Sequence, residues 1–242
     1  MELFTIIFIG LVFSGASLVH GICGFGFSLI SVGVLSMILG PRIAVPMDII
    51  AASANCFYLT WLLRKDIMWK ETLVLTAISI IFVPFGTMFV SHFDAGIVIR
   101  SLGMIIVFVS IISMVKKNRS SIFANHYPKW LAGAISGLLG GAFNTPGPPL
   151  VLYSFNSHWP IRNAMANLQL YFSLMVFVIT FSFWWQNLLN WSIVGIGAMF
   201  TPIVILFTFV GSMLAKRLTV SRLAIIVNVA MLVLGVVLLV KG

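Results

Sequence analysis

The chain has 242 residues, of which 61% are hydrophobic and only 8% are charged, and its mean hydropathy is +1.15. Soluble domains carry about 25% charged residues, so the composition excludes a water-soluble enzyme, a nucleic-acid-binding module and a disordered chain. The formal net charge of +9 fits a membrane protein that keeps Lys and Arg in its cytoplasmic loops. We therefore expect an all-α polytopic membrane protein whose surroundings are the lipid bilayer and which binds no nucleic acid.

Apolar blocks follow one another along nearly the whole chain. A membrane-spanning helix needs about 20 mostly apolar residues. Eight such blocks occur, at 3–39, 43–63, 72–93, 97–115, 130–155, 161–185, 191–214 and 223–240. The one sizeable polar stretch separates four blocks from four. We therefore expect a first transmembrane repeat at 1–115, a cytoplasmic linker at 116–129 and a second transmembrane repeat at 130–242.

The first block of each half is too irregular for one helix. Block 3–39 is long for a single crossing and is rich in glycine at 20–28. Block 130–155 is interrupted by Asn-Thr-Pro-Gly-Pro-Pro at 144–149. Gly and Pro at this density break a helix, and irregular backbone within a bilayer must be buried in protein or line a cavity. We expect each block to form a broken or re-entrant hairpin.

The positions of the basic residues favour hairpins that return to the side from which they enter. With this arrangement, eleven of the 14 Lys and Arg residues share one side, and only Arg42, Arg100 and Lys241 face the other. This asymmetry obeys the positive-inside rule. Each half then adds three transmembrane helices to its hairpin. Because three is odd, the two repeats are inverted relative to each other, and both termini of this multi-pass protein lie outside the plasma (inner) membrane.

Two broken helices can bind an anion without a buried Lys or Arg. A break exposes unpaired N–H groups and the positive end of a helix dipole, and inverted repeats with interrupted helices are typical of secondary transporters. Ser28 in the first break and Asn144 and Thr145 in the second would add hydrogen-bond donors. The alternative interpretation is that the glycines of these two blocks bind no anion and only let the helices pack closely.

Polar residues inside the apolar blocks are further candidates, because burying them in lipid is costly. Three of them could line a substrate path or form interhelical hydrogen bonds: Asn55, Gln169 and Tyr171. Asp48 could couple transport to protons or could pair with Arg42 near the interface. His20 could donate a hydrogen bond or titrate. The sequence has neither a zinc-protease motif nor a phosphate-binding loop, so we expect no enzymatic activity, no metal and no cofactor.

The residues at 137–153, Gly-Leu-Leu-Gly-Gly-Ala-Phe-Asn-Thr-Pro-Gly-Pro-Pro-Leu-Val-Leu-Tyr, resemble the second glycine-rich signature of the TauE/SafE sulfite exporter family, also called the 4-toluene sulfonate uptake permease family. The stretch 21–28 resembles its partner signature. The resemblance implies a transporter of small sulfur-containing anions: sulfite, sulfonate, sulfoacetate or thiosulfate. By motif position it implies the substrate-binding residues Gly24, Gly26, Ser28, Asn144, Thr145, Gly147 and Pro148.

Two other functions stay open at this point. The chain could be a channel for a small anion or solute, or it could be an accessory subunit of a larger membrane complex. A secondary transporter would show saturating flux by alternating access, with a small anionic substrate as its partner. The protein could also form a homodimer.

Overall fold

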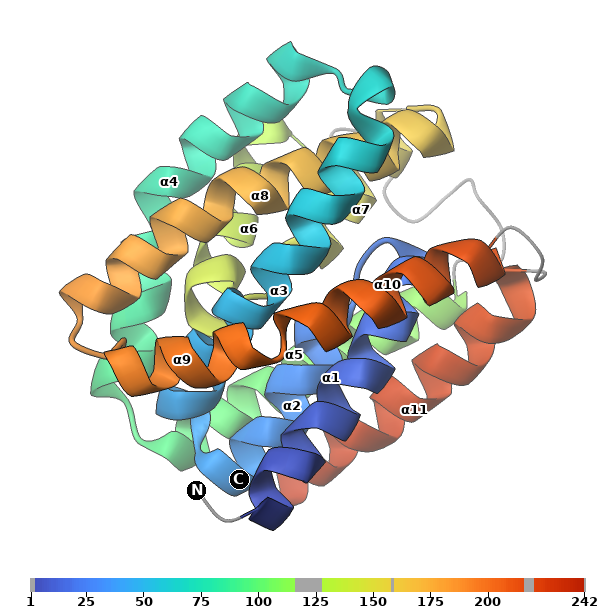
Figure 1. The fold of residues 1–242 in the computed structure, drawn as a ribbon. Helices are drawn as coiled ribbons and strands as arrows, with labels where there is room; N and C mark the ends of the chain where they lie inside the picture. The colour runs from blue at the N-terminus through green and yellow to red at the C-terminus, as the bar shows by residue number, and fades with distance from the viewer. Residues whose placement is uncertain (1–2, 116–127, 158, 216–219, 242) are drawn as a thin grey trace.

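The computed structural model describes residues 3–115, 128–157, 159–215 and 220–241. Every regular element in these ranges is a helix (Figure 1). The helices are α1 (Leu3–Cys23), α2 (Phe27–Leu39), α3 (Pro41–Leu63), the short 3₁₀ helix η1 (Arg64–Asp66), α4 (Trp69–His92), α5 (Ala95–Val115), α6 (Lys129–Phe143), α7 (Gly147–Asn156), α8 (Ile161–Trp185), α9 (Trp191–Met199), α10 (Thr201–Ala215) and α11 (Val220–Lys241). The predicted all-α fold is confirmed.

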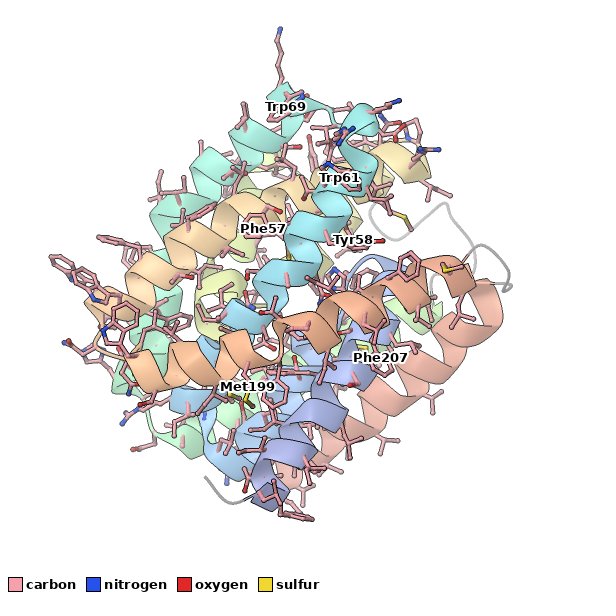
Figure 2. The ribbon with its side chains drawn as sticks, viewed as in Figure 1. Phe57, Tyr58, Trp61, Trp69, Met199 and Phe207 are labelled. Carbon is pink, nitrogen blue, oxygen red and sulfur yellow. The ribbon has the colours of Figure 1, made fainter. Side chains whose placement is uncertain are left out.

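The outer surface of the bundle is apolar. Large side chains such as Phe57, Trp61 and Met199 are exposed and project outward from α3 and α9 (Figure 2). Exposed apolar surface on this scale needs an apolar environment. Five segments are long and apolar enough to cross a membrane, namely Leu3–Cys23, Pro41–Asp66, Trp69–His92, Ile161–Trp185 and Trp191–Ala215. The chain is therefore a multi-pass membrane protein.

Both predicted breaks are present and are built in the same way. α1 ends at Gly24, whose φ is +77° and whose N–H donates to the His20 carbonyl at 2.7 Å. α6 ends at Asn144, whose φ is +51° and whose N–H donates to the Gly140 carbonyl at 2.8 Å. A left-handed residue, commonly Gly and sometimes Asn, is a standard helix terminator. Residues 24–26 and 144–146 therefore interrupt the two hairpins.

Two ends of the bundle can be recognised from polar contacts. Asp66 pairs with Arg162 at 2.7 Å, and Glu71 pairs with Lys129 at 2.7 Å. These contacts join the end of α3, the start of α4, the start of α6 and the start of α8, which together we call the basic end. At the opposite end, Arg42 at the start of α3 donates to the Val90 and Phe93 carbonyls at the end of α4.

The two hairpins enter the bundle from opposite ends. Tyr153 in α7 donates to Glu71, the residue that also binds Lys129 at the start of α6, so the second hairpin begins and finishes at the basic end. In the first hairpin, Phe13 of α1 and Leu35 of α2 share one core cluster with residues from the first half of α3. That hairpin returns to the opposite end. The inversion of the two repeats, their origin by duplication and the sidedness of the termini stay predictions.

Close packing by glycine also occurs, but at other glycines than those in the breaks. A Cβ on Gly21 would collide with the Thr208 carbonyl oxygen, and a Cβ on Gly141 would collide with the Val83 carbonyl oxygen. α1 thus packs on α10, and α6 packs on α4, so each hairpin packs against a helix of the other half. The close-packing interpretation therefore holds at Gly21 and Gly141, while a role of the break glycines in anion binding stays a prediction.

Two predicted boundaries differ from the structure. Block 191–214 is divided into α9 and α10 at Phe200, two residues before Pro202, which has no N–H to continue the helical hydrogen bonds. In the predicted linker, Lys129 begins α6, and residues 116–127 lie outside the described residues. The division of the chain into two repeats stays a prediction.

Candidate functional site

The two breaks meet at a buried cavity of about 40 Å³. It is lined by residues from the end of α1, both breaks, the starts of α2 and α7, and the middle of α3 and α8. One water needs roughly 10–15 Å³ of such space, so the cavity can hold a few waters or a small ion. We call it the central cavity.

Most of the residues predicted in the two signatures lie at this cavity. Its lining includes six of them, namely Gly26, Ser28, Asn144, Thr145, Gly147 and Pro148, and it also includes His20. The predicted residues that do not line it are Gly24, Asp48, Asn55, Gln169 and Tyr171. The structure thus brings the two signatures together, although they are more than a hundred residues apart in the sequence.

Asp48 lies directly behind the cavity wall. Its carboxylate accepts a hydrogen bond from Ser31 and a second, at 2.8 Å, from the side-chain amide of Asn144. The same amide also donates to the Ser28 hydroxyl at 3.1 Å. Asp48 is fully buried, and it does not form the alternative pair with Arg42, which binds backbone carbonyls at the end of α4. This network fixes the second break against α2 and α3.

A second chain of hydrogen bonds orients His20. The Gln169 amide donates to the Gly24 carbonyl at 2.5 Å, so its oxygen faces His20 and accepts from Nε2 at 3.3 Å. His20 therefore carries its proton on Nε2, and its buried Nδ1 has no hydrogen-bond partner among the described residues. Gly24 and Gln169 act through His20 and do not line the cavity themselves.

The remaining two predicted residues lie elsewhere. Asn55 accepts a hydrogen bond from Thr208 of α10, so in this structure it forms the interhelical contact that was its alternative interpretation. Tyr171 lines a separate, smaller cavity. Neither residue lines the central cavity.

Three residues that contribute to the site were not singled out from the sequence. Ser31 follows Ser28 by one helical turn and binds Asp48, and that spacing is a signal that could have identified it. Phe172 and Cys56 line the cavity. Neither differs from the many apolar residues around it in a way that the sequence reveals.

The electrostatics of the cavity come from dipoles and neutral groups. Among the described residues that line it, none is Lys or Arg. The first turn of α2 supplies N–H groups that have no acceptor within the helix, at the positive end of its dipole. α7 supplies fewer, because Pro148 and Pro149 follow Gly147 directly and carry no N–H. The second break contributes instead the buried Thr145 hydroxyl, which has no partner among the described residues, whereas both N–H groups of the Asn144 amide are taken by Ser28 and Asp48.

Comparison with known proteins gives one family. The family model described as Sulfite exporter TauE/SafE matches residues 7–238, which is nearly the whole chain. No curated protein matches the chain, and no solved structure matches it.

Proposed function

Since the chain belongs to the sulfite exporter TauE/SafE family, we propose that it carries a small sulfur-containing oxyanion across the plasma (inner) membrane by alternating access. The substrate class comprises sulfite, sulfonate, sulfoacetate and thiosulfate. The observation that carries the proposal is the meeting of two helix breaks at one buried cavity that holds hydrogen-bond donors. Interrupted helices that meet inside a bundle are the usual substrate site of secondary transporters.

The anion is held by donors that need no full positive charge. The N–H groups at the start of α2 face one side of the cavity, and Thr145 supplies a hydroxyl donor from the other. The Asn144 amide, whose two N–H groups bind Ser28 and Asp48, holds that side of the cavity in place. Gly147 keeps the backbone accessible, because a side chain there would project toward Phe172 and Phe25, which line the cavity. Apolar walls from Phe172 and Val176 keep out competing water and so strengthen these contacts.

His20 couples the anion to a proton. With Nε2 committed to Gln169, a proton can be added only at Nδ1, which converts His20 into a cationic donor at the cavity. The other ionisable groups near it are the Asp48 carboxylate behind Asn144 and the Cys56 thiol in the cavity wall. A bound anion is attracted by protonated His20 and repelled by Asp48, so anion and proton enter together.

Flux into proteoliposomes tests the proposal. Purified protein is reconstituted, and sulfite and a small sulfonate are supplied with and without a pH gradient. Saturating uptake with counterflow is the expected result. Linear flux without counterflow would indicate a channel, and no flux from the purified chain would indicate an accessory subunit.

A matched pair of glycine variants tests the site itself. In Gly147→Leu, the new side chain projects toward Phe172 and Phe25 and fills the cavity, so we expect flux to be lost. In Gly195→Leu, the new side chain projects from an exposed position of α9 with nothing within 4 Å, so flux is retained. Unchanged flux in Gly147→Leu would remove the second break from the mechanism.

A further inference from the structure

A second cavity of about 10 Å³ lies between α4, α7 and α8 and is lined by Leu75, Leu150, Trp159, Asn167, Leu168 and Tyr171. On α8, Tyr171 lines this second cavity and the next residue, Phe172, lines the central cavity; on α7, Leu150 lines the second cavity and Pro148 lines the central cavity. Farther along the same two helices, Tyr153 and Arg162 lie at the basic end. The second cavity therefore lies between the central cavity and the basic end.

Two buried donors in this second cavity lack a partner. The Asn167 side-chain oxygen accepts from the Met68 N–H at 2.7 Å, which leaves the amino group of Asn167 facing inward. That amino group and the Tyr171 hydroxyl are buried without a hydrogen-bond partner among the described residues. Unsatisfied buried donors are rare because they are costly. These two can be satisfied by an oxyanion that passes between them.

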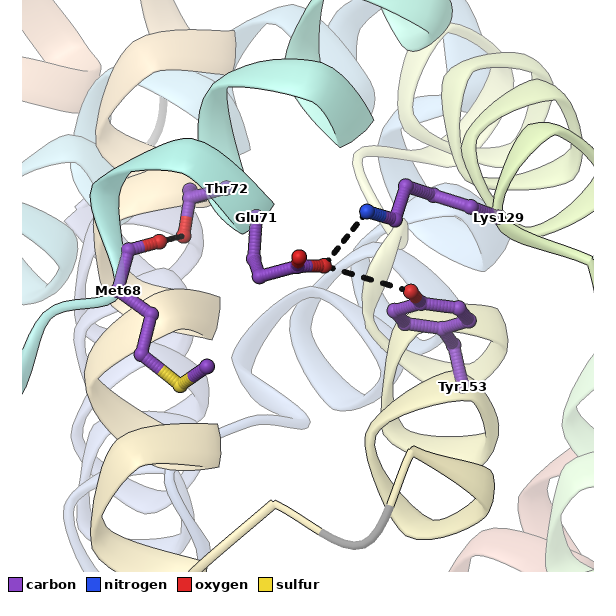
Figure 3. A network of polar contacts seen from close by, with 5 residues as sticks. All are labelled: Met68, Glu71, Thr72, Lys129 and Tyr153. Atoms are coloured by element: carbon purple, nitrogen blue, oxygen red, sulfur yellow. Dashed lines mark hydrogen bonds and ion pairs between the residues drawn. The ribbon is translucent and has the colours of Figure 1, made fainter.

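A polar network closes this cavity toward the basic end. Glu71 of α4 binds Lys129 of α6 at 2.7 Å and accepts from Tyr153 of α7 at 3.4 Å (Figure 3). The ring of Tyr153 meets the ring of Trp159 edge-on at 5.4 Å, and Trp159 lines the second cavity. Hydrogen bonding to Glu71 raises the pKa of Lys129, so the lysine is charged at neutral pH.

We propose that the anion travels between the central cavity and the basic end past Tyr171 and Asn167, and that the network of Glu71, Lys129 and Tyr153 is the gate that closes this path. The inference rests on the proposed function, because it names the route that serves the same site. When the gate opens, Lys129 is released from Glu71 and becomes the first positive charge that an anion meets at this end. The separation of α4 from α6 and α7 also widens the second cavity.

Cys56 offers a reporter of this path that does not depend on transport. It lines the central cavity, and the only other thiol in the chain is Cys23. In a Cys23→Ser background, a membrane-impermeant methanethiosulfonate reagent that carries a sulfonate group is added from the basic end, and the rate of Cys56 modification is measured. Glu71→Gln removes the ion pair, and we expect modification to accelerate roughly fivefold, the size of effect that a partly exposed ion pair supports.

The chain supplies a matched control at the same end of the bundle. Asp66→Asn removes the other 2.7 Å ion pair, that with Arg162, which does not border the second cavity, so modification should keep its original rate. Lys129→Gln opens the same gate from its other side and should accelerate modification as Glu71→Gln does. An unchanged rate in both gate variants, or equal acceleration in Asp66→Asn, would overturn the gate.

The path is tested separately from the gate by Tyr171→Phe. This change keeps the ring and removes the hydroxyl, so we expect maximal sulfite flux to fall several-fold while the sulfite concentration for half-maximal flux stays the same, because the central cavity is intact. Unchanged maximal flux would overturn the path. If the unmodified protein carries none of the anions offered, the proposed function fails, yet the Cys56 rates still decide whether the gate exists.

Discussion

The side-chain amide of Asn144 donates a 2.8 Å hydrogen bond to the carboxylate of Asp48, and this single contact joins the break of the second hairpin to the third helix of the first half. Asn144 does two things at once. Its backbone ends α6 in the left-handed conformation, which Gly would adopt more easily. Its side chain joins Ser28 and Asp48 at the cavity wall, which Gly could not do.

Asn144→Gly separates these two roles. The variant keeps the left-handed backbone and loses the amide, so the second break is no longer held against Ser28 and Asp48. We expect the misplaced cavity wall to lower sulfite flux at low substrate concentration by about tenfold, which corresponds to about 1.4 kcal/mol, while the far-UV circular dichroism spectrum stays that of the unmodified protein. The measurement is initial uptake into proteoliposomes.

Asn187→Gly is the control for this change. Asn187 is the other non-glycine residue with positive φ among the described residues, at +56°, and it is exposed in the turn after α8. Its replacement should leave flux unchanged. Equal losses in the two variants would mean that backbone freedom, and not the amide, accounts for the effect.

His20→Gln tests the coupling group. Protonation of His20 at Nδ1 brings a positive charge to the cavity, so flux in the unmodified protein should rise as the pH on the anion-loading side falls. The variant cannot be protonated, and its flux should become nearly independent of a pH gradient. His92→Gln, at the exposed end of α4, should keep the pH dependence. A His20 variant that responds to the gradient as before would assign coupling to another group.

Gly21→Ala tests the packing of the first hairpin on α10. The added methyl group meets the backbone of Thr208 and Gly211, which cannot rotate away, so overpacking should cost about 1–3 kcal/mol. We expect a lower midpoint of thermal unfolding in detergent. Gly15→Ala, on an open face of the same helix, should leave the midpoint unchanged or raise it, since Ala favours helix more than Gly does. Equal midpoints for both variants would argue against this contact.

Thr208→Val tests the role of Asn55. The change removes the hydroxyl that binds Asn55 and leaves buried polar atoms unpaired, so stability should fall by about 1–3 kcal/mol. The sulfite concentration for half-maximal flux should stay the same, because neither residue lines the central cavity. A marked rise in the sulfite concentration for half-maximal flux would indicate that Asn55 takes part in substrate binding.

The positions of the breaks could be predicted because their cause is local. Pro and Gly at 144–149 and Gly at 20–28 prevent a regular helix whatever surrounds them. That each hairpin returns to the side from which it enters was predicted from the charge asymmetry of the loops. Both inferences need only the order of residues along the chain.

The partners of the intramembrane polar residues could not be predicted in the same way. Asn55 and Tyr171 sit on helices that are apolar on nearly every face, so the sequence carries no stripe that distinguishes the cavity side from the lipid side. Their orientation depends on how α3 and α8 rotate against neighbouring helices. The bond between Asp48 and Asn144 spans 96 positions in the chain, and no local pattern indicates it.

The close contact between Gly21 of α1 and Thr208 of α10 affects the order in which the protein can fold during synthesis. α1 leaves the ribosome well before α10, the helix against which it packs. Because chains are made from the N-terminus onward, the glycine face of α1 stays uncovered by this partner until α10 has been synthesised. Because α1 packs on α10 and α6 packs on α4, neither half can complete its helix packing without the other.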